Sequence, residues 1–211
     1  MMRYHVQEIL EEIRNRIPQL EDPILKESHK GKSLLKHIEE CLEFTECLSD
    51  QLGINPKIKK FAEVLAIVHD IGKALPEWSL DEKRIRHSEA GALLLSQLYG
   101  FLSECFQLEQ RYVHALVYFT WRHHSTLKYP RIDLLEKSSY LRYHWNEVEK
   151  NLWPTLRMFK EEFRDISENL ELVDSVGVFK LADIISASGL NPQFILDQYK
   201  WSDDIPVSYT H

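Results

Sequence analysis

The chain has 211 residues, 44% hydrophobic and 28% charged, a composition and length typical of one globular domain. Its formal net charge of −7 disfavours broad, non-specific coating of nucleic acid, although bound divalent cations would reverse the charge locally. The first residues carry charge, and no apolar run approaches the roughly 20 residues of a membrane helix. We therefore expect a cytoplasmic protein with no signal peptide and no membrane partner.

Helical periodicity covers most of the chain and no set of alternating strands is present, so the sequence predicts an all-α fold. A weaker helix over residues 1–20 is expected to end at Pro18. Ser33 caps a helix that runs to Asp50, and the pair Asn55-Pro56 opens a helix that ends at Gly72.

A polar loop follows over residues 76–86. Further helices are predicted over 87–99, 104–121, 141–165 and 171–188, and Gly189 stops the last one. We expect a single domain over 1–211, with its motifs within about 30–190 and an irregular tail over about 200–211. The three cysteines, Cys41, Cys47 and Cys105, lack zinc-site spacing and are expected to stay reduced.

The most informative segment is the apolar run over residues 64–68, which ends in His69 and Asp70. Burying an ionised carboxylate without a partner costs several kcal/mol or more, so Asp70 needs a proton, a counter-ion or a metal. The adjacent imidazole and further histidines downstream favour the metal.

Seven residues form the candidate constellation: His37, His69, Asp70, His87, His123, His124 and Asp183. Considered singly, a histidine on an apolar face is more often a hydrogen-bonded core residue than a metal ligand. Asp183 alone could pair with a buried arginine in place of a metal. The ordinary interpretation is kept for the remaining histidines: His5, His29, His114, His144 and His211. Together, the seven residues are better explained by a two-metal centre.

Helix geometry restricts how these residues can act. Adjacent residues on a helix point about 100° apart, so His69 would bind one ion while Asp70 spans to a second, roughly 3.5–4 Å away. His123 and His124 converge only if their helix ends or distorts beside them, which the following Tyr129-Pro130 pair favours.

The order of these residues resembles the HD metal-dependent phosphohydrolase superfamily, and more narrowly the stand-alone CRISPR-associated HD nuclease of type I interference. The resemblance covers about residues 30–190 and rests on five motifs: Ser33-Leu34-Leu35-Lys36-His37, His69-Asp70-Ile71-Gly72-Lys73, Arg86-His87-Ser88-Glu89-Ala90, Trp121-Arg122-His123-His124 and Leu181-Ala182-Asp183 with Ser186-Ala187-Ser188. It implies a helical bundle with the metal site between core helices.

The resemblance also implies the ligand sets. The first ion would be held by His37, His69, Asp70 and Asp183, and the second by Asp70, His87, His123 and His124. Histidine-rich ligation favours manganese, nickel or cobalt, with iron, zinc and magnesium as further candidates. The implied substrate is single-stranded DNA, the displaced strand of an R-loop, and the implied partners are a separate helicase and a CRISPR RNA-guided surveillance complex.

Asp70 and Lys73 are the candidate catalytic residues, although Lys73 is equally explained as a cation near a helix C-terminus. Arg122, Ser186 and Ser188 are candidate substrate-binding residues. The two serines either orient ligands or bind phosphate, while small residues at a helix crossing explain them as well. Aromatic side chains near the motifs either stack on bases or pack in the core: Trp78, Tyr118, Trp121 and Tyr129. Clusters of basic residues lie near the histidines in the sequence. They either belong to the site or are ordinary solvated helix faces.

Two other functions stay open at this stage. An HD-family nucleotide phosphohydrolase would hydrolyse mononucleotides in a closed pocket and leave circular DNA intact. A non-catalytic HD module would bind nucleic acid or a partner protein, although the ligand set looks complete for catalysis.

Overall fold

A computed structural model describes residues 5–80, 85–125, 127, 130–164 and 169–189. Over these residues the chain is predominantly helical, which confirms the predicted all-α fold. The longer helices are α1 (Val6–Arg16), α2 (Leu34–Gln51), α3 (Pro56–Val68), α4 (His87–Gln97), α5 (Tyr99–Phe106), α6 (Gln110–Arg122), α10 (Trp153–Glu162) and α11 (Leu170–Ser188). The predicted tail over about 200–211 lies outside the described residues.

Short elements connect these helices. They are strands β1 (Glu27–His29) and β2 (Lys32–Ser33), the 3₁₀ turn η1 (Ile71–Ala74), helices α7 (Ile132–Glu136), α8 (Ser139–Tyr143) and α9 (Trp145–Glu147), and the π-turn η2 (Val148–Leu152). The antiparallel pair β1–β2 was not predicted, because three and two residues are too few to show an alternating pattern.

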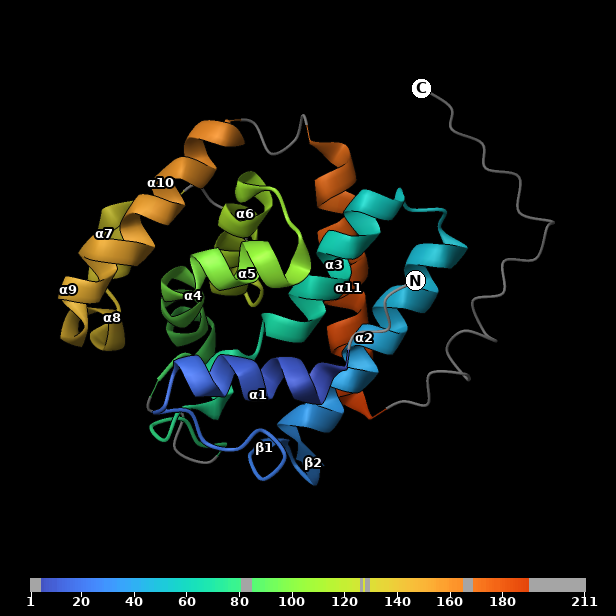
Figure 1. Cartoon of the computed structure of the whole chain (residues 1–211), viewed down its shortest axis with the longest axis horizontal. Helices are drawn as coiled ribbons and strands as arrows, with labels where there is room; N and C mark the ends of the chain where they lie inside the picture. The colour runs from blue at the N-terminus through green and yellow to red at the C-terminus, as the bar shows by residue number, and fades with distance from the viewer. Residues whose placement is uncertain (1–4, 81–84, 126, 128–129, 165–168, 190–211) are drawn as a thin grey trace.

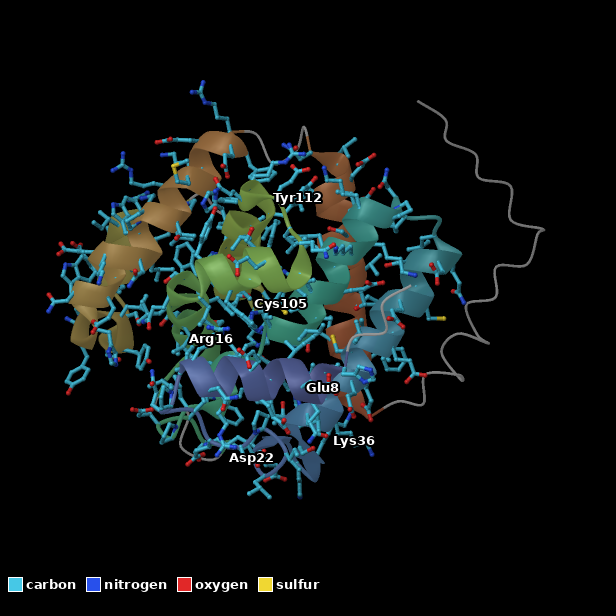
Figure 2. All side chains as sticks on the ribbon, in the orientation of Figure 1. Glu8, Arg16, Asp22, Lys36, Cys105 and Tyr112 are labelled. Carbon is cyan, nitrogen blue, oxygen red and sulfur yellow. The ribbon has the colours of Figure 1, made fainter. Side chains whose placement is uncertain are left out.

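The helices form two neighbouring groups (Figure 1). Helices α2, α3 and α11 pack against one another, and α4 and α6 pack together beside them, with α10 against α6. Helix α1 crosses in front of the bundle, and its labelled Arg16 places its guanidinium carbon 4.6 Å from the Phe101 ring centroid on α5 (Figure 2). The labelled Cys105, like Cys41 and Cys47, is a free thiol, as expected.

Helix α3 is the central helix, and every residue from Phe61 to Val68 is buried. A helix enclosed on all sides is apolar around its whole circumference, which explains the uninterrupted hydrophobic run before His69. Its N-terminus is capped as predicted, since Asn55 Oδ1 accepts from the Lys57 amide at 2.9 Å. Ser33 caps α2 in the same way, and Gly189 ends α11 with a φ of 66°.

Three predicted helix boundaries were wrong. Helix α3 ends at Val68 and not at Gly72, because the chain tightens into η1. The predicted helix over 104–121 is two helices, separated at Gln107, whose φ is 49°. The predicted helix over 141–165 is broken near His144 and widens into η2 just before Pro154, which has no amide hydrogen to donate. Among the described residues, no helix has the length and hydrophobicity to cross a membrane.

Candidate metal centre

All seven residues of the predicted constellation meet at one place between α2, α3, α4, α6 and α11. His37 comes from α2 and Asp183 from α11, while His69 and Asp70 lie between α3 and η1. His87 is the first residue of α4, and His123 and His124 directly follow α6. The carboxylate of Asp70 lies at the centre, with side chains grouped around each of its two oxygens.

The first group, which we call the enclosed half, surrounds Asp70 Oδ2. This oxygen lies 3.2 Å from His37 Nε2 and 3.4 Å from His69 Nε2. Asp183 Oδ1 lies 3.3 Å from His37 Nε2 and 3.5 Å from His69 Nε2. The two histidines are fully buried, so protein would surround an ion held here except beside Asp183, whose side chain is 13% exposed.

The second group, the open half, surrounds Asp70 Oδ1. This oxygen lies 3.1 Å from His87 Nε2 and 3.6 Å from His123 Nε2. His124 completes the group, with its Nε2 2.8 Å from His87 Nε2. His123 is buried, but the His87 side chain is 17% exposed and His124 is exposed, so this half faces solvent.

At the ends of two helices, the same kind of hydrogen bond orients a histidine towards the cluster. His69 follows α3 and its Nδ1 donates to the Ala66 carbonyl at 2.9 Å, while His123 follows α6 and its Nδ1 donates to the Thr120 carbonyl at 2.7 Å. Each bond satisfies a carbonyl of the last helical turn and directs Nε2 of the imidazole into the centre. Helix α6 ends at Arg122, directly before His123 and His124, and these two histidines need such a helix end in order to converge.

Ser186 orients His37 and does not face the groove described below. Its hydroxyl accepts from His37 Nδ1 at 2.9 Å and donates to Glu40 Oε2 at 3.0 Å, which leaves His37 Nε2 for the cluster. Lys32 binds the same Glu40 carboxylate and so connects β2 to α2. Ser188 is exposed, and its hydroxyl donates to the Ile185 carbonyl within α11 at 2.8 Å, so the structure does not bring it to the cluster.

Close packing of two glycines positions His87 relative to Asp70. A Cβ on Gly72 would lie 2.1 Å from the His87 carbonyl oxygen and 2.7 Å from the Gly91 nitrogen. Only glycine at this position therefore allows η1 and the first turn of α4 to touch. The sequence of three small residues around Gly91 permits this approach from the α4 side.

The electrostatics of the cluster require positive charge between the two carboxylates. Burial opposes ionisation of Asp70, but the charges of Lys73, His69 and His87 outweigh it and hold the pKa of Asp70 well below its usual range. Burial also lowers the pKa of His69, and the neighbouring Asp70 and Asp183 overcome this and raise it to about 10. Divalent cations would meet the same need.

The donor set fits such ions. Among the described residues, the Nε2 atoms of His37, His69 and His123 are buried without a hydrogen-bond partner, although buried polar atoms almost always have one. The ligand atoms of Asp70, His87, His123 and His124 lie within 4.8 Å of one another, as do those of His37, His69 and Asp70. Imidazole nitrogens and carboxylate oxygens in these groups would suit divalent metal ions, and Asp70 belongs to both groups.

A groove of about 720 Å³ opens at the open half, lined by His87 and His124. Lys73 lies in its wall, with Nζ 2.6 Å from Asp70 Oδ2 and 3.0 Å from Ser28 Oγ, which it donates to. Arg122 also lines the groove, and its guanidinium carbon lies 5.0 Å from the Trp121 ring centroid.

The candidate aromatic side chains fall into different surroundings. Trp78 and Trp121 line the groove, whereas Tyr118 is fully buried and stacks on Phe159 at 4.0 Å between ring centroids, a core position. Tyr129 lies outside the described residues. Several basic residues away from the groove are in ion pairs with acidic neighbours, which supports the solvated-face interpretation: Lys26, Lys32, Lys57, Lys59 and Arg131.

Sequence reasoning missed His29, which lies beside the cluster. Its ring centroid is 4.5 Å from that of His37, and it lines the groove together with Lys73. Burial, with the charges of Lys73 and His37, lowers its pKa to about 4, so it is neutral at physiological pH. The only signal in the sequence is its position shortly before the His37 helix, since strand β1 is too short to be recognised.

This combination, a helical bundle around a cluster of histidines and aspartates, is that of a metal-binding helical domain. A comparison with protein-family models matches residues 34–188 to the HD domain, so the chain belongs to the HD domain family. HD domains bind divalent metal ions and act as metal-dependent phosphohydrolases. No curated protein and no solved structure matches the chain.

Proposed function

We propose that this protein is a metal-dependent nuclease that hydrolyses phosphodiester bonds of single-stranded DNA. The observation that carries the proposal is that two cavities border the cluster. One is the groove, and the other is a cavity of about 400 Å³ lined by Lys180 and Asp183. His124 and Ser125 line both, so a strand lying in them would pass the open half and continue in both directions.

The lining of the groove supports a polyanionic substrate with bases. Arg86, Arg122 and Lys73 supply positive charge, and the largely buried Trp78 and Trp121 contribute aromatic atoms to the lining. Single-stranded nucleic acids bind to grooves that combine such cations with aromatic side chains.

The roles of the residues follow from the two halves. Two divalent ions, when bound, supply Lewis-acid stabilisation of the phosphate and lower the pKa of water towards neutrality. Asp70 would bridge them, with His37, His69 and Asp183 holding the enclosed ion and His87, His123 and His124 holding the open one. Lys73 would contact a non-bridging phosphate oxygen as a point charge from the wall of the groove. The histidine-rich ligands favour manganese, nickel or cobalt.

We further propose that the protein acts in CRISPR type I interference in the cytoplasm, with a separate helicase and an RNA-guided surveillance complex. Support comes from the sequence motifs and from the net charge of −7. Because that charge weakens intrinsic attraction to DNA, a partner complex would deliver the displaced strand.

A nucleotide phosphohydrolase is the second candidate. The specific observation in its favour is the volume of the groove, about 720 Å³, which is within the range of small-ligand sites.

The test uses chelator-stripped protein, circular single-stranded DNA, and manganese added or withheld, with Asp70→Ala as the inactive variant. A mononucleotide phosphate-release assay runs in parallel. Manganese-dependent cutting of the circle that is absent in Asp70→Ala is the expected result. An intact circle with released phosphate would transfer the assignment to a nucleotide phosphohydrolase, and no hydrolysis in either assay would favour a binding module.

A further inference from the structure

A third cavity adjoins the groove, and none of the seven cluster residues lines it. It has a volume of about 430 Å³, and its outer wall comes from α7, α8 and the turn between them, including Lys137, Ser139 and Tyr140. We call it the side pocket. Its inner wall contains Arg86 and Arg122, which also line the groove, so the two cavities are contiguous.

The side pocket is cationic although the protein as a whole is acidic. Arg86, Arg122 and Lys137 contribute three positive charges, and Glu89, the one carboxylate among the lining residues that the structure describes, lies 3.4 Å from Arg86. The chain carries 33 acidic and 26 basic residues, so this concentration of cations runs against its overall balance. An anionic ligand fits such a pocket.

The shared wall connects the side pocket to the ligands of the open half. Arg86 directly precedes His87, and Arg122 directly precedes His123. The Arg122 guanidinium packs against the Trp121 ring, which holds it at the end of α6. An anion contacted by these arginines is therefore next to whatever phosphate the open half binds.

The outer wall offers groups that suit a nucleotide unit. Ser139 supplies an exposed hydroxyl and Tyr140 a partly buried ring, beside the exposed ammonium of Lys137. Arginine and lysine beside hydroxyl and aromatic groups are typical contacts to a phosphate–sugar backbone and a base.

We infer that the side pocket is a subsite for the nucleotide adjacent to the phosphodiester at the metal cluster, with Lys137 contacting its phosphate. This inference rests on the proposed nuclease function. It narrows the substrate class to oligonucleotides that extend beyond the scissile bond on the side of α7 and α8. A diester too small to reach the side pocket would use the metal cluster alone.

The test compares two substrates in manganese: a short single-stranded DNA oligonucleotide and bis(4-nitrophenyl) phosphate. The measured quantity is the ratio of their kcat/KM values in wild type, Lys137→Ala and Lys160→Ala. Lys160 is an exposed lysine on α10, so its substitution removes the same charge elsewhere. We expect the ratio to fall about tenfold in Lys137→Ala, through KM of the oligonucleotide, and to stay constant in Lys160→Ala.

Salt dependence supplies a readout that a merely structural role would not change. For single strands, each lost phosphate contact reduces the slope of log affinity against log salt by about 0.7. Lys137→Ala should show this reduction for the DNA oligonucleotide and for the corresponding RNA, because the contact is to phosphate.

The experiment distinguishes a failure of the side-pocket subsite from a failure of the proposed nuclease function. An oligonucleotide that wild type cleaves with an unchanged ratio and salt slope in Lys137→Ala would overturn the subsite and leave the nuclease function intact. An oligonucleotide that wild type does not cleave, while mononucleotides lose phosphate, would overturn the nuclease function together with the subsite.

Discussion

The enclosed and open halves of the cluster share one carboxylate but differ in how the fold builds them. The enclosed half takes His37 and Asp183 from the interiors of the long helices α2 and α11, and His37 and His69 are fully buried. The open half takes its histidines from the first residue of α4 and the residues after α6, and His124 is exposed.

This difference separates two tasks within one site. Ligands on packed helices lose little additional freedom when an ion binds, so the enclosed half is preorganised and shielded from solvent. Ligands at helix ends beside a groove leave room for substrate and for ion exchange. We therefore expect the enclosed half to hold its ion more tightly and the open half to contact the scissile phosphate.

The largest effect is expected for Asp70→Ala, which removes the group common to both halves. The variant should lose both ions and at least on the order of 10³-fold in hydrolysis. Metal content after stripping and reloading, measured by mass spectrometry, checks this. Asp174→Ala, which removes an exposed carboxylate from α11, is the control and should bind two ions. One ion retained in Asp70→Ala would show that the halves do not share their carboxylate.

Gly72→Ala should remove metal binding by the open half and leave metal binding by the enclosed half. The added Cβ would lie 2.1 Å from the His87 carbonyl oxygen, so α4 must move away from Asp70. We expect a loss of about 1–3 kcal/mol in the free energy of unfolding and a stoichiometry of one ion in place of two. Denaturant unfolding and metal titration measure these quantities.

Gly177→Ala is the control for that experiment. A Cβ on Gly177 would meet nothing within 4 Å, and the residue lies in the middle of α11. This variant should gain about 0.5–1 kcal/mol in stability and keep both ions. Two ions bound by Gly72→Ala would mean that the glycine contact does not position His87.

Comparing His37→Ala with His124→Ala tests whether the enclosed and open halves bind separate ions. His37→Ala removes a fully buried ring, so it should lower Tm even in the metal-free protein and abolish the tighter binding step. His124→Ala should leave the Tm of metal-free protein within a degree or two and weaken the second binding step. Calorimetric titration with metal measures both binding steps. If both variants lost the same binding step to the same extent, the enclosed and open halves would not bind their ions separately.

The smallest effect is expected for Ser186→Ala, which acts on the enclosed half through the orientation of His37. Loss of the hydroxyl that accepts from His37 Nδ1 should weaken binding of the enclosed ion about tenfold. Ser188→Ala removes an exposed hydroxyl two residues later and should leave affinity unchanged. An affinity for the tighter ion that is equal in both variants would remove Ser186 from the site.

Much of the site was recognisable before the fold was known. The seven candidate residues, which the order of motifs along the chain indicated, meet in the structure. The strongest signals were the carboxylates of Asp70 and Asp183, each next to apolar helical residues. The sequence left Ser186 with two roles, orienting a ligand or binding phosphate, and only its contact with His37 shows the first. The position of His29 beside the cluster was not recognisable, because it depends on contact with His37 through a strand that was not predicted. Helix ends without a local signal, such as the one at Gln107, were missed for a related reason.

The sequence by itself determined the helical class, the caps at Ser33 and Asn55, and the chemical type of the ligands. These features depend on neighbours within a few residues, through helical periodicity, capping hydrogen bonds and the cost of burying Asp70. Only the tertiary structure decided which nitrogen of each histidine faces the centre, which half is exposed, and how the groove meets the side pocket. Those properties arise from contacts such as Gly72 with His87 and Ser186 with His37, which packing alone brings together.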